Sequence, residues 1–285
     1  MMFRDYVATG ELMPVALPSK NITTLHDFTA EVEKYIGSTL ESMAWYRGCG
    51  KATYLLQPGL YRHTNITDAS KLLEQDSLMI SRFKQRCIPY LPHRVNDIWE
   101  YLFLMQHFGV PTRLLDWTEN PYVALYFALE KAGRSKDSSG GYIYHEDAAV
   151  WLMDPPAWNR TVFSYQGYKK GVLSLSDSLI DGYSPAAQPH SMNSDPAAMY
   201  GAHNISRIVA QKGVFTMFGK NSSSMESLFA NGGFPPACLN KLVIPKGAIA
   251  SLRAAILAVG ITESVVFPDL DGLSREIKRQ FGYEE

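Results

Sequence analysis

Apolar residues recur at helical spacing through the first half of the chain. Phe28, Val32 and Ile36 share one helical face, and similar spacing continues after residue 68. A first helix is predicted to start after Thr23 or Thr24, either of which could cap it. Three further helices are predicted at Asp68 to Arg86, about Val95 to Phe108, and Pro121 to Lys131. We therefore expect a mainly helical first half, with one earlier strand at Ala44 to Arg47.

The pattern changes after Gly133, where short β-prone runs replace the helical period. These runs predict strands at Tyr142 to Tyr144, Ala149 to Met153, Ile205 to Ala210, Val214 to Phe218 and Lys241 to Ile244. The C-terminal part predicts a helix from Ala248 to Val259, a short strand from Val265 to Phe267, and a helix after Asp271 with Leu273, Ile277 and Phe281 facing inward. Because helices gather early and strands late, we expect an α+β fold in which N-terminal helices pack on a mixed or antiparallel sheet.

The pattern offers no point at which to divide residues 21–285 into two domains. Pro14 and Pro18 interrupt residues 1–20, which are expected to form an irregular N-terminal arm. Residues 164–204 show little periodicity and are too long for an ordinary connection. This segment is predicted to be a long loop, either a functional lid or an insertion.

Charge and cysteine content narrow the classes of protein. Lys and Arg number 27 against 28 Asp and Glu, so no global basic field exists to hold nucleic acid or anionic lipid. The three cysteines form no CxxC pair, which fits a reducing compartment. Arg4 and Asp5 fall where a signal peptide would need an apolar core. A cytoplasmic protein with no membrane association is expected.

Several common motifs are excluded. Gly48-Cys49-Gly50-Lys51 lacks the earlier glycine and the following Ser or Thr of a phosphate loop, and no GxSxG elbow occurs. The seven histidines include no pair at helical metal-ligand spacing, so no metal is expected.

Two segments carry more specific information. The first is Trp45-Tyr46-Arg47-Gly48, and the second runs from Met105 through Gln106-His107-Phe108-Gly109-Val110-Pro111-Thr112-Arg113-Leu114-Leu115-Asp116-Trp117-Thr118. Together they resemble the FRG domain family, named for its (Phe/Tyr)-Arg-Gly motif. The resemblance continues, with shorter matches, to Phe267-Pro268-Asp269-Leu270. It implies that residues 21–285 form one FRG domain.

The order of these motifs is similar to that of ADP-ribosyltransferases, which implies a transferase-like fold with NAD as co-substrate. In that comparison Arg47 matches the early basic motif, Asp116-Trp117-Thr118 falls near the central polar motif, and Gln211 is nearest to the late acidic position. A glutamine cannot supply the negative charge of the usual glutamate. Glu263 and Glu226 are therefore the other candidates for the late catalytic position.

The residues themselves leave alternatives open. The Arg47 guanidinium could grip a diphosphate, or it could form a structural ion pair with Asp116. Asp116 and Thr118 precede a helix, so each could cap it or contact a substrate. His107, Thr112 and Arg113 lie on a corner fixed by Gly109 and Pro111. Tyr46, Gly48 and Tyr126 complete the predicted NAD-binding set, with aromatic rings available to stack on a base.

The resemblance implies cleavage of the nicotinamide–ribose bond of NAD. Arg47 would hold the diphosphate, Thr118 or His107 would orient the ribose or nicotinamide, and Gln211 or Glu263 would position the 2′-hydroxyl or the acceptor. The acceptor is expected to be a macromolecule, with nucleic acid favoured over protein. A toxin or antiphage role under an antitoxin partner fits this chemistry. The alternative is a non-catalytic module that binds nucleotide, nucleic acid or protein.

Overall fold

A seven-stranded sheet forms the centre of the molecule. The computed structural model describes residues 16–91, 95, 97–138, 140–185, 187, 191–201 and 206–283. In spatial order the strands are β1 (Ser19–Asn21), β9 (Leu239–Ile244), β6 (Ala148–Met153), β2 (Trp45–Cys49), β3 (Leu114–Thr118), β8 (Gly213–Met217) and β7 (Ala197–Met199). The β1 strand pairs in parallel with β9, and every other neighbouring pair is antiparallel. The sheet is therefore mixed, and the expected α+β class is confirmed.

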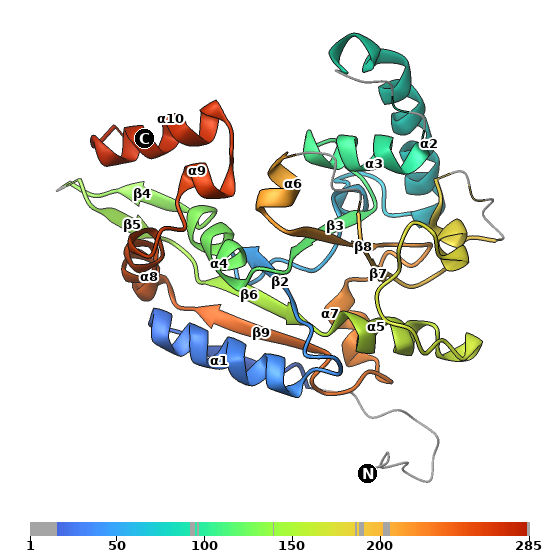
Figure 1. The fold of residues 1–285 in the computed structure, drawn as a ribbon, viewed down its shortest axis with the longest axis horizontal. Coiled ribbons are helices and arrows are strands. Elements are labelled where there is room, and N and C mark those ends of the chain that lie inside the picture. Colours follow the sequence, from blue (N-terminus) through green and yellow to red (C-terminus); the bar gives the residue numbers. More distant parts are fainter. Residues whose placement is uncertain are drawn as a thin grey trace.

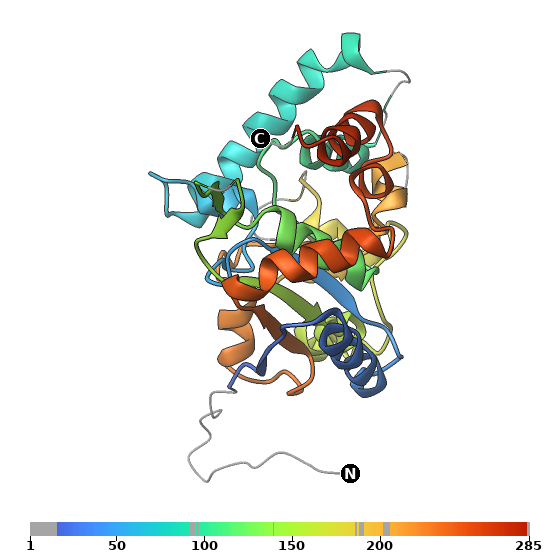
Figure 2. The ribbon, with the colours of Figure 1, turned by 90° about the vertical axis from the view of Figure 1, so that its left-hand side faces the viewer.

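Helices cover both faces of this sheet (Figures 1 and 2). One core cluster lies between the sheet and α1 (Leu25–Ser38), α4 (Pro121–Glu130) and α8 (Lys246–Ala258). On the same face, a second cluster packs α2 (Ala69–Arg86) and α3 (Ile98–His107) over β3, β8 and β7. The opposite face carries a tryptophan-rich cluster with α5 (Pro155–Val162) and α7 (Met225–Ala230).

The remaining elements lie around these layers. The first 3-10 segments along the described part of the chain are η1 (Gly59–Arg62), η2 (Ile88–Tyr90) and η3 (Ser164–Gln166). A separate hairpin of β4 (Arg134–Lys136) and β5 (Tyr142–Tyr144) lies beside α8. The helices α9 (Glu263–Val266) and α10 (Leu270–Gln280) pack together, and α9 contacts α6 (Ser206–Ala210). Figure 1 shows these last helices beside α4, on the side of the molecule where α3 also lies.

Helix starts follow the capping signals in the sequence. The side chains of Thr24, Asp68 and Asn120 accept hydrogen bonds from backbone N–H groups of α1, α2 and α4. The third helix starts at Ile98 rather than at Val95, because Asp97 caps it. These capping residues confirm the predicted helices to within a few residues.

Two predicted strands are helices in the structure, and the pattern does not predict the strands β1, β3, β4 and β7. Residues 206–210 form α6 and residues 263–266 form α9. Short β-branched runs do not separate strand from helix by periodicity alone, and here Ile208, Val266 and Phe267 are buried by tertiary packing. Of these, β3 lies in the centre of the sheet and carries Asp116 and Thr118, which the sequence places only before a helix.

The segment 164–204 belongs to the body of the fold. It contributes η4 (Ser178–Tyr183) and the edge strand β7, and its Leu173, Ile180 and Tyr183 are buried in the core against α3 and β8. Residues 186, 188–190 and 202–204 of this segment lie outside the described residues. The described part of this segment therefore contains regular elements that pack in the core, and the prediction that it is an insertion stays a prediction.

At the two ends of the chain the structure also differs from the pattern. Ser19 and Lys20 belong to β1 and extend the sheet, whereas residues 1–15 of the predicted arm lie outside the described residues. In α10 the side chains of Leu273, Ile277 and Phe281 are exposed instead of facing inward. This helix contacts α9, so its apolar stripe does not reach the main core.

Candidate functional site

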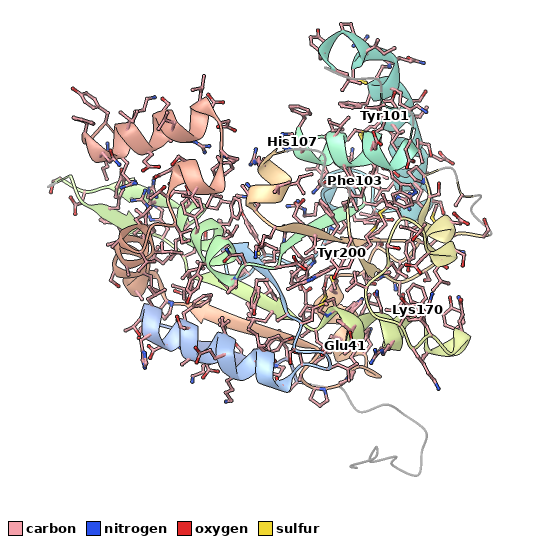
Figure 3. The ribbon with its side chains drawn as sticks, in the orientation of Figure 1. Glu41, Tyr101, Phe103, His107, Lys170 and Tyr200 are labelled. Carbon is pink, nitrogen blue, oxygen red and sulfur yellow. The ribbon has the colours of Figure 1, made fainter. Side chains whose placement is uncertain are left out.

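A cavity of about 320 Å³ opens on the sheet face between α3 and α4. Its floor comes from β2, β3 and β8, and α6 closes a further side. Polar lining residues include Arg47, His107, Asp116, Lys131 and Arg207. Figure 3 shows His107 at the end of α3 near α6, with Phe103 one turn earlier on the same helix. The cavity thus joins residues that are distant in the sequence.

The cavity lies where the central pairing of the sheet is weakest. Tyr46 opposite Thr118 is the only registered pair between β2 and β3 within the described residues, whereas β2 pairs with β6 over five positions. Arg47 follows this single pair and sends its guanidinium toward β3. Its Nη1 donates to the backbone oxygen of Asp116 at 2.6 Å.

Gly48 brings α4 against β2 beside the cavity. A Cβ at this position would lie 1.9 Å from the backbone oxygen of Ala124, well inside contact distance. Only glycine permits this approach, because every other residue would push the helix away. The glycine of the Tyr-Arg-Gly motif therefore has a packing role in addition to its place at the cavity wall.

Cations dominate the charged groups that line the cavity. Arg47, Lys131 and Arg207 contribute three positive charges, and Asp116 is the one carboxylate among the described lining residues. Arg47 Nε is buried and has no hydrogen-bond partner among the described residues. A buried guanidinium N–H without a partner is a donor that an anionic ligand can satisfy.

The Phe267 ring packs against Arg207, the second arginine of the cavity lining. The Arg207 guanidinium lies 4.3 Å from the centre of the Phe267 ring, and Arg275 lies 4.2 Å from the same ring. Phe267 also meets the cavity residue Phe127 edge-on at 5.8 Å. Desolvation lowers the pKa of Arg207, Arg275 lowers it further, and Asp269 opposes both. Packing on an aromatic face fixes a charge that would otherwise move freely.

The pKa values of His107 and Lys131 are also lowered. Desolvation is the main cause for both groups; Arg207 adds to it for His107 and Arg47 for Lys131. Lys131 meets solvent at the cavity edge, where its ammonium lies 5.0 Å from the centre of the Phe127 ring. Repulsion from the neighbouring arginines thus adds to desolvation in lowering both pKa values.

A hydrogen-bond chain fixes the carboxylate of Asp116. Gln106 Nε2 donates to Asp116 Oδ2 at 2.8 Å, and Thr112 Oγ1 donates to Gln106 Oε1 at 2.5 Å. Thr112 Oγ1 in turn accepts from the backbone N–H of Leu114 at 3.0 Å. Thr112 was expected to bind the co-substrate, but the structure places it behind Gln106, outside the cavity lining.

Arg113 also lies outside the cavity. It is fully buried, its Nε donates to Asp76 at 2.8 Å, and its other nitrogens donate to the backbone oxygens of Phe218 and Tyr183. These bonds join β3 to α2 and to η4. Arg113 therefore connects three parts of the core and does not face a ligand.

Tyr126 and the two glutamate candidates lie away from the cavity lining. Tyr126 lies on α4 and is buried in the core next to Phe267. Glu263 is 3% exposed and accepts both hydrogen bonds of Arg279, at 2.7 and 2.9 Å. Glu226 lies on α7 and accepts from the backbone N–H of Leu56. Neither glutamate is among the residues around Arg47.

Thr118 and Gln211 do line the cavity, but their polar groups already have partners. Thr118 Oγ1 donates to the backbone oxygen of Gln211 at 2.5 Å and accepts from the N–H of Asn120. Gln211 Nε2 donates to the backbone oxygen of Val266, at the end of α9. These bonds connect β3, α6 and α9 into one wall. Tyr46, Arg47, Gly48, His107 and Asp116 are the other predicted residues that the cavity brings together.

The sequence reasoning missed three polar lining residues. Lys131 follows Phe127 by four positions and comes directly after the last residue of α4, so a helical projection from the motif could have found it. Gln106 stands beside His107 in the quoted motif. Arg207 begins one of the shorter matches to the family, Arg207 to Thr216, but its place beside the cavity depends on the contact of α6 with α9.

Residues 42–137 match the family model of the FRG domain. The chain therefore contains an FRG domain, and that match includes Arg47, Gln106, His107, Asp116 and Lys131, whereas Arg207 and Gln211 follow it. In the comparisons with curated proteins and with solved structures, nothing matches this chain. None of the described helices combines the length and apolarity that a membrane span requires.

Proposed function

We propose that the protein binds NAD in this cavity and transfers ADP-ribose from it to a macromolecule. The observation that carries this proposal is the gathering of Arg47, Lys131 and Arg207 around one carboxylate in an aromatic-lined cavity. Such a charge pattern fits an anionic nucleotide better than a neutral metabolite.

The residues present fit the parts of NAD. Arginine forks match the oxygens of a diphosphate, and Arg47 retains a buried N–H that has no partner among the described residues. Phe103, Phe127 and Phe215 offer ring faces or edges to a base or to nicotinamide. A volume of about 320 Å³ is at the lower end for small-molecule sites, so it suits one nucleotide half of NAD with the remainder at the mouth.

The transfer reaction needs few groups from the protein. The bond between ribose C1′ and the nicotinamide nitrogen breaks, the nitrogen keeps the electron pair, and positive charge develops on the ribose. A nucleophile of the acceptor then forms a bond to C1′ and loses its proton. Arg47 and Arg207 hold the diphosphate, and His107 orients the ribose or the nicotinamide ring. Fixed charges and dipoles around the cavity lower the barrier because they need no rearrangement during the reaction.

A second candidate function is a nucleotide-binding module without turnover. The observation that favours it is the position of Glu263, which is bound to Arg279 and lies outside the cavity lining. A protein of this class would bind NAD or a related nucleotide and release no nicotinamide.

Labelled NAD separates the two candidates. Purified protein would be incubated with a cell lysate and NAD labelled in its ADP-ribose part. We expect nicotinamide release and label retained in the nucleic-acid fraction. Arg47→Ala should lose both signals, whereas Arg82→Ala, an exposed arginine on α2, should keep them. Label in the protein fraction would change the acceptor class, and NAD binding without nicotinamide release would establish the second candidate.

We further propose that the enzyme acts in the cytoplasm of the producing cell, as a toxin or antiphage effector restrained by an antitoxin protein. Consumption of NAD and modification of nucleic acid would both stop growth. Induced wild-type protein should therefore arrest a bacterial culture, and Arg47→Ala at the same expression level should not. Equal growth arrest by both proteins would contradict an effect through this cavity.

A further inference from the structure

Hydrogen bonds hold the Asp116 carboxylate in one orientation in the cavity, and the proposed function has not yet given this carboxylate a role. Its Oδ2 accepts from Gln106, and none of the described residues donates to its Oδ1. Arg47 bonds the backbone oxygen of Asp116 at 2.6 Å, while the distance from Arg47 Nη1 to Oδ2 is 3.8 Å. Arg47 and Asp116 therefore form an ion pair at 3.8 Å without a hydrogen bond between their side chains, and 57% of the Asp116 side chain remains exposed to solvent in the cavity.

The hydrogen bonds determine which way the Gln106 amide faces. Thr112 Oγ1 accepts from Leu114 N–H, so its hydroxyl proton is directed at Gln106 Oε1. The amide nitrogen must then face Asp116, because an amide oxygen there would repel the carboxylate. Gln106 consequently holds the Asp116 carboxylate in one direction through its hydrogen bond to Oδ2.

We propose that Asp116 is the carboxylate that assists cleavage of the nicotinamide–ribose bond, with Gln106 and Thr112 as its positioning residues. This inference rests on the proposed function, and it names the negative group that the late glutamate candidates do not provide. As nicotinamide leaves with the electron pair, Asp116 stabilises the positive charge on the ribose. The charge disappears when the acceptor nucleophile bonds to C1′ and releases its proton, so Asp116 is unchanged at the end.

The matched variants Asp116→Asn and Glu119→Gln test the assignment of Asp116. Glu119 is an exposed carboxylate just beyond β3 and outside the cavity lining. We expect Asp116→Asn to lower kcat for nicotinamide release by about 10²- to 10³-fold. Calorimetric NAD affinity should be retained or increased, because a negative charge near the diphosphate is removed. Glu119→Gln should leave both quantities unchanged.

The variant Gln106→Leu tests the positioning role through the separate responses of kcat and KM. The charged groups facing Asp116 are Arg47 from β2, Lys131 just after α4 and Arg207 from α6, with His107 from α3 in the same cavity. All of them stay in place in this variant. Loss of the amide donor should lower kcat while KM changes little. A merely structural role for Gln106 would change stability and leave kcat of the folded protein unchanged.

The outcomes are separable. If wild-type protein binds NAD but releases no nicotinamide, the proposed transfer and this assignment both fail. If wild-type protein is active and folded Asp116→Asn keeps kcat within about threefold, the assignment of Asp116 is overturned while the proposed function stands. An unchanged kcat in a folded Gln106→Leu protein would overturn the positioning role alone.

Discussion

Gly48 permits the close contact between β2 and α4, and a substitution that adds one methyl group at this position tests that contact. Gly48→Ala would place Cβ 1.9 Å from a backbone oxygen that cannot move aside. We expect destabilisation of at least about 1–3 kcal/mol, the usual cost of overpacking. The control is Gly37→Ala in α1, where a Cβ meets nothing within 4 Å and a gain of about 0.5–1 kcal/mol is expected. Urea denaturation measures both, and equal stabilities would contradict the close contact.

Arg113 has a structural role that can be measured by the same means. It forms a fully buried ion pair with Asp76, so Arg113→Ala leaves an unpaired buried carboxylate. A loss of about 3–5 kcal/mol in the free energy of unfolding is expected. The double variant with Asp76→Ala should lose less than the sum of the two single variants, because both remove the same pair. Additive losses would show that the two residues act separately.

The His107 imidazole links stability to pH. Desolvation, with Arg207 as a second cause, lowers its pKa below the ordinary value of 6.5. A lowered pKa means that folding favours the neutral ring, so this stability is present above about pH 6.5 and is lost as pH falls through the lower folded value. Between pH 7 and pH 5 the urea midpoint should fall more for wild-type protein than for His107→Gln. Parallel pH profiles would contradict this linkage.

At the scale of elements, the exposed face of α10 gives a direct comparison with a buried helix. Leu273 and Ile277 are 46% and 47% exposed, whereas Ile256 on α8 is 1% exposed. Serine at either α10 position should change stability by no more than about 0.5 kcal/mol. Ile256→Ala should cost about 2–5 kcal/mol. A large loss at Leu273 or Ile277 would show that the α10 stripe is buried in solution.

The sequence predicted elements well where local signals decide. Thr24, Asp68 and Asn120 mark helix starts because a cap acts within one turn. It failed at α6 and α9, where β-branched residues are buried within short helices by neighbours far along the chain. The prediction that Leu273, Ile277 and Phe281 face inward was also wrong. An amphipathic period shows which residues share a helical face, but it does not show whether that face packs against another element.

At the scale of the whole molecule, the strand order could not be derived from the sequence. The central strands β6, β2, β3 and β8 come from widely separated segments, and their order decides which residues share a cavity. The motif segments predicted Arg47, His107 and Asp116 in one site, and the cavity contains all three. Arg207 lines the same cavity because it packs on Phe267. Arg113 does not line the cavity, because its ion pair with Asp76 places it in the core.

The central claim is that the cationic cavity binds NAD, and isothermal titration calorimetry tests it most directly. NAD would be titrated into wild-type protein, Arg47→Ala, Arg207→Ala and the exposed-arginine control Arg82→Ala. Each charge-assisted contact is worth about 1.5–3 kcal/mol, so either cavity variant should bind at least tenfold more weakly while Arg82→Ala matches the wild type. Equal NAD affinity in all four folded proteins, or no binding by the wild type, would contradict the account.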